Sequence, residues 1–218
     1  GSLGVISQSG SMLGALMSRG AARGIGFSSL LSIGNEADLS IAELIEVLVE
    51  DNRTEAILLF LEGVRDAVAL GEAARNAYNA GKPVIAYKLG RSEVGRELAV
   101  SHSGAIAGQD VAIDAFLRNS GIIRIEMMET LLELPALALK SKPSSGKRVA
   151  VVTTTGGGAA MVVDRLGAAG LELVPAPENL REELNKTGLS LGQGRLIDLT
   201  MAGTREGVYG RALEVLLN

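Results

Sequence analysis

The chain has 218 residues, of which 47% are hydrophobic and 21% are charged, and its formal net charge is −4. This composition can bury one large core or two smaller ones. Mild acidity without a block of lysine and arginine argues against a nucleic-acid surface, and no apolar run approaches the roughly 18 residues of a membrane helix. With no cysteine there are no disulfides and no thiolate metal sites. No secretory signal pattern is present, so we expect a cytoplasmic protein.

Five short apolar runs in the first two thirds of the chain predict five strands, at residues 3–7, 28–33, 56–60, 83–88 and 122–125. Segments of helical periodicity separate them. Continuous apolar runs indicate strands that are buried on both faces, which is typical of a parallel sheet with crossover helices. The sequence therefore predicts a doubly wound α/β domain.

The best marked of these helices starts at residue 40. Ser40 and Glu43 have the spacing of a capping box, and apolar residues then recur on one helical face, at Ile41, Leu44, Ile45 and Leu48. We expect this face to form core and to carry no chemistry. Glycines that end helices are expected at Gly20, Gly24, Gly81, Gly121 and Gly170.

Residues 140–147 (KSKPSSGK) lack apolar content and resemble a linker. We predict a first domain over residues 1–142, a linker at 143–147 and a second α/β domain over 148–218. The second domain is expected to contain strands at 148–152 and 171–174 and helices at 159–169, 177–186 and 208–217. It looks truncated, and we expect the chain to be a fragment of a longer polypeptide.

Two loops combine hydroxyl groups with glycine between a strand and a helix. The first comprises Ser7, Gln8, Ser9 and Gly10, and the second runs from Thr153 through Thr155 to Gly156, Gly157 and Gly158. The amides of a helix's first turn and its dipole favour a phosphate group at such a place. Neither loop has the lysine of a Walker loop or the GxGxxG spacing. The alternative is that Ser9 simply caps its helix.

The only histidine, His102, lies in the small-residue run 101–108 (SHSGAIAG). A neutral imidazole, with an ordinary pKa of about 6.5, can attack phosphorus near neutral pH. Ser103 and Gly104 leave room for the phosphoryl group and are candidates to bind it. The alternative is a solvated loop histidine or a polar core residue.

Two acidic loops follow predicted strands, at the sheet edge where ligand sites collect. Glu62 could hold one imidazole nitrogen of His102 and so orient the other for attack. The alternative is a solvated loop carboxylate. In the run 34–38, Asn35 and Glu36 are candidates for the wall of the site, and Asp38 is expected to cap the following helix. No metal site is predicted.

Four motifs, in this order, resemble the nucleoside-diphosphate-forming acyl-CoA synthetases, which are relatives of succinyl-CoA synthetase. They are residues 4–10 (GVISQSG), 34–38 (GNEAD), 61–66 (LEGVRD) and 101–105 (SHSGA). The resemblance implies a flavodoxin-like domain followed by the start of a second similar domain. It also implies that His102 is phosphorylated, that Glu62 steadies it, and that helices starting near Ser9 and Gly156 aim their amino ends at the phosphohistidine.

The implied reaction converts acyl-CoA, phosphate and nucleoside diphosphate into carboxylic acid, CoA and nucleoside triphosphate, in either direction. The resemblance implies no cofactor bound by this chain. CoA, ATP or ADP and Mg²⁺ would be co-substrates of a full enzyme that supplies CoA-binding and ATP-grasp domains or subunits, in an oligomer. The isolated chain is expected to be inactive, and the acyl group and the nucleotide base stay open.

Two other functions remain open from the sequence. The chain could be the CoA-ligase-like module of an acyl-CoA-dependent protein acetyltransferase, or a regulatory CoA-binding protein without turnover. The presence of His102 and Glu62 favours the ligase. Residues 90–101 could form either a mobile connection for the histidine or a static loop.

Overall fold

A computed structural model of the chain describes residues 1–95, 97, 109–140 and 146–217. The predicted site residues His102, Ser103 and Gly104 and part of the predicted linker lie outside the described residues. The chain divides into two compact units, Gly1–Lys142 and Pro143–Asn218. Each unit is described by itself.

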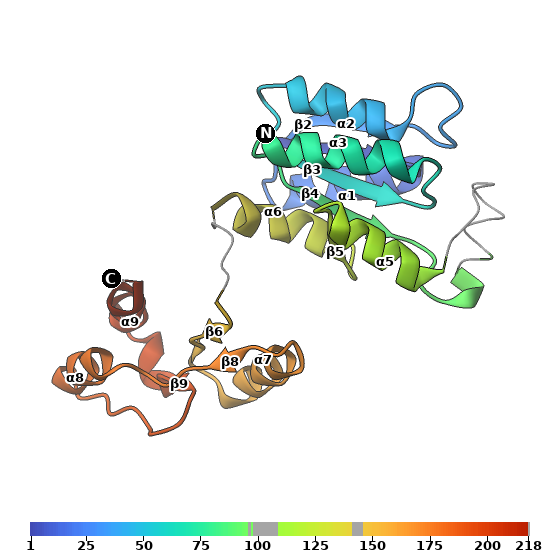
Figure 1. The fold of residues 1–218 in the computed structure, drawn as a ribbon. Coiled ribbons are helices and arrows are strands. Elements are labelled where there is room, and N and C mark those ends of the chain that lie inside the picture. The colour runs from blue at the N-terminus through green and yellow to red at the C-terminus, as the bar shows by residue number, and fades with distance from the viewer. Residues whose placement is uncertain (96, 98–108, 141–145, 218) are drawn as a thin grey trace. The chain divides into compact units, whose positions relative to one another are not determined.

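The first unit is built on a five-stranded parallel sheet (Figure 1). Its strands are β1 (Leu3–Ser7), β2 (Phe27–Ser32), β3 (Ala56–Leu61), β4 (Val84–Lys88) and β5 (Ile123–Ile125), in the order β2-β1-β3-β4-β5. All neighbouring strands pair in parallel. The predicted doubly wound α/β fold is confirmed, and this strand order is the flavodoxin-like one, which reverses direction between β1 and β3.

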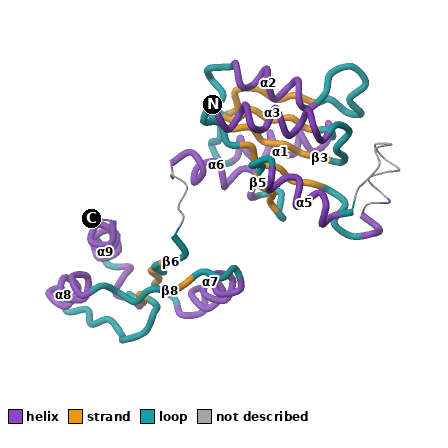
Figure 2. The backbone as a smooth tube through the Cα atoms, viewed as in Figure 1, coloured by secondary structure: helices purple, strands orange, loops and turns teal. Residues whose placement is uncertain are grey.

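Helices cover both faces of this sheet (Figure 2). They are α1 (Gly10–Ala22), α2 (Ile41–Glu50), α3 (Ala67–Asn79), α5 (Asp110–Asn119) and α6 (Thr130–Lys140). Apolar residues of α2, α3 and α5 pack with Ile57, Leu59 and Leu61 of β3 on one face. Residues of α1 and α6 pack with Val5 and Leu58 on the other face. Both faces of the central strands are buried, which is why their sequences show apolar runs rather than alternation.

The helix that starts after Ser40 has the predicted cap. The Ser40 hydroxyl accepts a hydrogen bond from the Glu43 amide, and the Glu43 carboxylate accepts one from the Ser40 amide. The residues predicted for its apolar face, Ile41, Leu44, Ile45 and Leu48, are all buried. The capping box and the core face of α2 are therefore confirmed.

The glycine predictions hold with one exception. Gly24, Gly81, Gly121 and Gly170 follow helices and have φ between +69° and +75°, the left-handed conformation typical of a helix end. Gly20 instead lies inside α1, so its prediction is wrong. A Cβ atom there would come within 2.5 Å of the Phe27 ring, which shows that the glycine permits close packing between α1 and β2.

The second unit is a smaller α/β arrangement with two short parallel pairs, β6 with β8 and β7 with β9. Its elements are β6 (Arg148–Val149), β7 (Val152–Thr153), α7 (Gly156–Ala168), β8 (Glu172–Leu173), α8 (Glu178–Lys186), β9 (Ile197–Asp198), η1 (Thr200–Thr204) and α9 (Val208–Leu217). Its core is a cluster formed by Ala176, Leu180, Leu184, Ile197, Leu199 and Ala212.

Three details of the second unit differ from the sequence prediction. The single strand expected at 148–152 is two short strands, β6 and β7, which pair with different partners. Helix α7 begins at Gly156 rather than at 159, because the successive glycines form its first turn. Strand β9 and helix η1 were not predicted, since segments this short have no periodicity to detect.

Candidate functional site

Four of the predicted site residues gather at the carboxyl edge of the sheet, where the strand order reverses. Ser7 ends β1, Gln8 and Ser9 follow it, and Glu62 follows β3. All of them are buried. Helix α1 leaves β1 on one face of the sheet and α3 leaves β3 on the other. Ligand sites of open parallel sheets lie at such a switch point.

The Ser7 side chain organises the turn that leads into α1. Its hydroxyl donates to the backbone oxygen of Ser9 at 2.7 Å and accepts from the Ser9 amide at 3.1 Å. Ser9 is the N-cap residue of α1, but its side chain makes no capping hydrogen bond and lies 3.2 Å from the Ser11 hydroxyl. The alternative that Ser9 simply caps the helix is therefore wrong. No acidic residue occupies the first turn of α1, and phosphate binding by Ser9 and Gly10 stays a prediction. Because the single hydroxyl proton of Ser7 is donated to the Ser9 backbone oxygen, we correct Ser7 from a phosphate ligand to a residue that shapes the turn.

The second unit repeats this turn with different residues. The Thr153 hydroxyl donates to the Thr155 backbone oxygen at 2.9 Å and accepts from the Thr155 amide at 3.0 Å. Thr155 is the N-cap residue of α7 without a side-chain capping bond, and the first turn holds Gly156, Gly157 and Gly158 with no acid. The shared pattern is hydroxyl, any residue, hydroxyl, glycine. Phosphate binding by Thr155 and these glycines stays a prediction, as does the joint action of the two helix ends.

Gln8 has a different role from the predicted one. Its side-chain oxygen accepts from the backbone amides of Glu62 and Gly63, the latter at 3.0 Å. Its side-chain nitrogen donates to the Gly63 oxygen at 3.1 Å and to the Glu36 carboxylate at 2.6 Å. The Gln8 backbone amide donates to the Phe60 oxygen. Because its donors serve the protein itself, we correct its assignment from a phosphate ligand to a structural link between loops.

Glu36 lies beside Gln8, and its place in the wall of the site stays a prediction. Its carboxylate accepts from Gln8 and also from the Ile41 amide, the first of α2, at 3.0 Å. Its backbone has φ +51°, a left-handed conformation that is uncommon for a glutamate. Asn35 is exposed. Asp38 is also exposed and the N-cap residue of α2 is Ser40, so the expected capping by Asp38 is wrong.

Glu62 is only 5% exposed, which excludes the solvated loop carboxylate. Its backbone amide donates to Gln8, and its backbone oxygen accepts from the Lys88 ammonium at 2.9 Å. Both peptide groups of Glu62 are thus held by side chains that follow or end the neighbouring strands β1 and β4. The proposed contact of Glu62 with His102 lies outside the described residues.

Lys88 is a residue that the sequence reasoning missed. It is 5% exposed, and its ammonium donates to the backbone oxygens of Glu62 and Leu89. Burial lowers its pKa, as does the nearby charge of Arg124, while Asp110 and Glu62 act in the opposite direction. A lysine that closes an otherwise apolar strand was the available signal, because a charge in such a place needs buried partners.

Arg124 of β5 adds a charged cluster beside Lys88. It forms ion pairs with Asp110 and, at 3.4 Å, with Asp114 of α5. Burial by itself would lower the pKa of Arg124, but the hydrogen bonds and charges of Asp110 and Asp114 outweigh it and raise the pKa. A surface cavity of about 500 Å³ adjoins this cluster and is also lined by Arg91 and Glu126, which pair at 3.1 Å.

Within the ranges that the structure describes, no group of three or more histidine, aspartate or glutamate side chains is placed to hold a metal ion. In the same ranges, no helix is both long and apolar enough to cross a membrane.

The strand order β2-β1-β3-β4-β5 is that of a flavodoxin-like sheet. The family model of the succinyl-CoA ligase like flavodoxin domain matches residues 1–138. The chain belongs to this family. The resemblance seen in the sequence motifs is thereby confirmed, and the match covers the first unit up to α6.

Named relatives of this succinyl-CoA ligase like domain are longer than the chain. It is 37% identical to an ADP-forming acetate–CoA ligase of Methanocaldococcus jannaschii, over 75% of this chain and 23% of that protein. It is 35% identical to subunit alpha of ADP-forming acetate–CoA ligase II of Pyrococcus furiosus, over 84% of this chain and 40% of the relative. The chain thus spans less than half the length of these relatives.

A solved structure is similar over most of the chain. It is the dinucleotide forming acetyl-coenzyme A synthetase 1 of Ca. Korarchaeum cryptofilum in complex with phosphate and ADP. The TM-score is 0.79 at 31% identity, with 92% of this chain and 44% of that chain covered.

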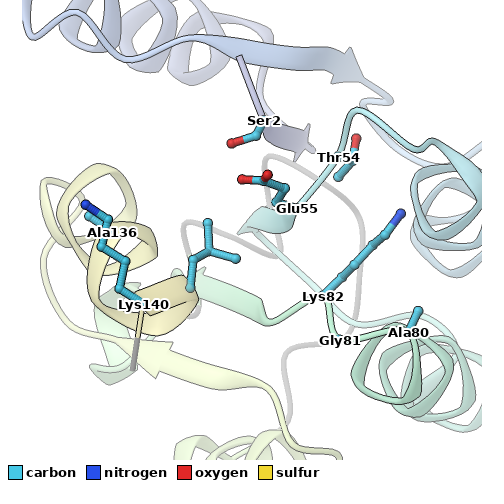
Figure 3. A pocket seen from close by; sticks show the side chains of 9 residues that line it. Ser2, Thr54, Glu55, Ala80, Gly81, Lys82, Ala136 and Lys140 are labelled. Carbon is cyan, nitrogen blue, oxygen red and sulfur yellow. The ribbon is translucent and has the colours of Figure 1, made fainter. Parts of the chain in front are cut away.

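A second cavity of the succinyl-CoA ligase like domain lies at the opposite, amino edge of the sheet. Figure 3 shows Ser2, Glu55 and Lys82 around it, and each of these residues precedes a strand. The Lys82 ammonium donates to the backbone oxygens of Leu48, Val49 and Asp51 at the end of α2. Since Glu62 lies at the carboxyl edge, this cavity is separate from the candidate site.

Proposed function

We propose that the chain is the phosphohistidine-bearing part of an acid–CoA ligase that forms nucleoside diphosphate from the triphosphate. The full enzyme interconverts acyl-CoA, phosphate and nucleoside diphosphate with carboxylic acid, CoA and nucleoside triphosphate. One observation carries the proposal: Glu62 is buried at the topological switch point, next to a helix whose first turn has no capping side chain. The family match and the named ADP-forming relatives support it.

In this proposal His102 is the nucleophile. One imidazole nitrogen forms the bond to phosphorus while the bond between phosphorus and the carboxyl oxygen of an acyl phosphate breaks, and the carboxylate leaves. Glu62 accepts a hydrogen bond from the other imidazole nitrogen and stabilises the cation that forms. The first-turn amides of α1, with Ser9, Gly10, Ser103 and Gly104, would stabilise the phosphoryl charge. Thr155 and Gly156 to Gly158 would form a similar anion site in the second unit.

The co-substrates bind largely outside this chain in our proposal. CoA and nucleotide with Mg²⁺ would be held by CoA-binding and ATP-grasp parts, on the same polypeptide or on partner subunits of a cytoplasmic oligomer. The isolated chain would then have no net activity. Covalent transfer through His102 divides one three-component reaction into two simpler steps.

The test is phosphorylation of the enzyme that joins this chain to its CoA-binding and ATP-grasp parts. Incubation with γ-labelled ATP should give a label that is stable to base and labile to acid. His102→Asn should abolish the label and net ligation and leave the circular dichroism spectrum unchanged. Full labelling of the His102→Asn enzyme would overturn the proposal, and CoA binding without any label would indicate a regulatory or acetyltransferase-type module instead.

Glu62→Gln tests the second role, since it keeps the side-chain shape and removes the charge. Loss of a charge-assisted hydrogen bond of about 1.5–3 kcal/mol predicts phosphorylation that is roughly tenfold to hundredfold slower. CoA and nucleotide binding should change little. Equal phosphorylation rates in the two enzymes would contradict the role of Glu62.

A further inference from the structure

The backbone of Glu62 is held from both sides by buried side chains. Its amide donates to the Gln8 side-chain oxygen, and its carbonyl oxygen accepts from the Lys88 ammonium at 2.9 Å. Gln8 and Lys88 are 7% and 5% exposed. They extend from the ends of β1 and β4, the strands on either side of β3.

We infer that Gln8 and Lys88 are positioning residues that fix the backbone of Glu62, so that its carboxylate is placed to accept a hydrogen bond from the phosphorylated histidine. This inference rests on the proposed function. We call the two side chains the Glu62 clamp. Both act through the peptide groups that flank Glu62.

The energetics of Lys88 argue for a positional role. Burial and the neighbouring cation of Arg124 disfavour its charged form. A buried ammonium is destabilising compared with an apolar side chain of similar shape unless it is well paired. Its ammonium donates to the Glu62 oxygen and to the oxygen of Leu89, the first residue after β4. The charge thus joins the loop after β3 to the connection after β4, while Glu62 and Asp110 offset it.

Gln8 anchors the other side of the clamp to a helix. The Gln8 side-chain oxygen accepts hydrogen bonds from the Glu62 and Gly63 amides. The Gln8 side-chain nitrogen donates at 2.6 Å to the Glu36 carboxylate, which also accepts a hydrogen bond from the first amide of α2. A continuous set of hydrogen bonds therefore connects α2 to the Glu62 peptide. Fixing a catalytic group within a fraction of an ångström is what such supporting contacts achieve.

Lys88→Met tests one side of the clamp in the enzyme that contains the CoA-binding and ATP-grasp parts. It keeps the length of the side chain and removes the donors. We expect single-turnover phosphorylation of His102 to slow by about tenfold to hundredfold, with KM for CoA and nucleotide within about twofold of wild type.

Lys82→Met is the matched control. Lys82 is also a lysine whose ammonium donates to backbone oxygens, here three at the end of α2, but it lies at the amino edge of the sheet. It should lower stability without slowing phosphorylation. Near-ultraviolet circular dichroism from the stacked rings of Phe60 and Tyr87, with centroids 5.6 Å apart, reports whether each variant keeps its native packing.

The other side of the clamp allows a rescue experiment. Gln8→Glu keeps the side-chain oxygen that accepts from both the Glu62 and Gly63 amides but places its second carboxylate oxygen against Glu36. The double variant Gln8→Glu with Glu36→Gln exchanges donor and acceptor in this contact. We expect the single change to slow phosphorylation by about tenfold or more and the double change to recover most of that loss.

The outcomes separate the clamp from the proposed function. If wild type forms phosphohistidine and Lys88→Met and Gln8→Glu react at the wild-type rate, the clamp is overturned and the function stands. If wild type forms none, the proposed function fails, and amide hydrogen exchange of the 218-residue chain decides on the clamp. Exchange at Glu62 and Gly63 should then be about tenfold faster in Gln8→Met than in wild type. Equal exchange would overturn the clamp.

Discussion

Replacing Glu36 separates the contribution of its carboxylate from that of its unusual backbone. The carboxylate accepts from the Gln8 side chain at 2.6 Å and from the Ile41 amide at 3.0 Å. The backbone lies at φ +51°, where glycine is favoured over residues that carry a Cβ atom. Glu36→Ala removes both hydrogen bonds and keeps the backbone strain, whereas Glu36→Gly removes both bonds and the strain.

The expected magnitudes follow from these contacts. A hydrogen bond to a charged group contributes about 1.5–3 kcal/mol and a bond to a helix's first amides about 0.5–2 kcal/mol. Since Glu36 is only half-buried, we take the lower part of each range, so Glu36→Ala should lower the free energy of unfolding by about 2–3 kcal/mol. Glu36→Gly should be less destabilising, by about 1 kcal/mol, because it relieves the left-handed strain.

Urea unfolding followed by near-ultraviolet circular dichroism measures this difference. All three phenylalanines and two of the three tyrosines, including the stacked Phe60 and Tyr87, lie in the first unit, so most of the signal follows that unit. The midpoints should rank wild type, then Glu36→Gly, then Glu36→Ala, at an unchanged slope. At an ordinary helix or strand position glycine is less stable than alanine, so the inverted order is diagnostic. An alanine variant as stable as the glycine variant would refute the assigned backbone conformation.

Two further predictions concern α1 and α2. Gly20→Ala should lower the free energy of unfolding by about 1–3 kcal/mol through overpacking, because its Cβ atom would lie 2.5 Å from the Phe27 ring. Gly14→Ala in the same helix is the control, since its Cβ atom meets nothing within 4 Å, and it should raise stability. Equal effects of the two changes on thermal unfolding would contradict this packing. The pKa of Glu43 is lowered from 4.5, first by the hydrogen bond from the Ser40 backbone amide and then by the one from the Ser40 side chain. The ionised Glu43 therefore stabilises the fold above pH 4.5, and this stabilisation is lost as the pH falls through the lowered pKa. Glu43→Gln should remove this part of the acid dependence of the melting temperature, and an unchanged acid profile would show that the ionised cap contributes nothing.

Much of the fold was predictable because the deciding interactions are local. Apolar runs located the five strands of the first unit to within a residue or so at each end. The capping box at Ser40 depends on residues only three positions apart. The helix ends at Gly24, Gly81, Gly121 and Gly170 depend on a single backbone angle each.

The candidate site was predictable only in part. The position of Glu62 after a buried strand placed it at the carboxyl edge of the sheet, but only the structure shows that it is buried. The role of Gln8 was not predictable, because its partners Glu62 and Gly63 lie 54 and 55 residues away in the chain. Lys88 reaches the Glu62 oxygen across a separation of 26 residues, and only the pairing of β3 with β4 brings the two together.

The sequence by itself determined the type and approximate limits of most elements, the capping box at Ser40 and the hydroxyl turns after β1 and β7. Periodicity and short-range hydrogen bonds depend only on neighbouring residues. The tertiary structure alone decided the strand order, the pairing of β7 with β9, the packing role of Gly20 and the contacts that hold Glu62. These depend on which segments meet in space. A glutamine amide or a lysine ammonium can satisfy many partners, and the folded sheet selects the ones that lie within about 3 Å.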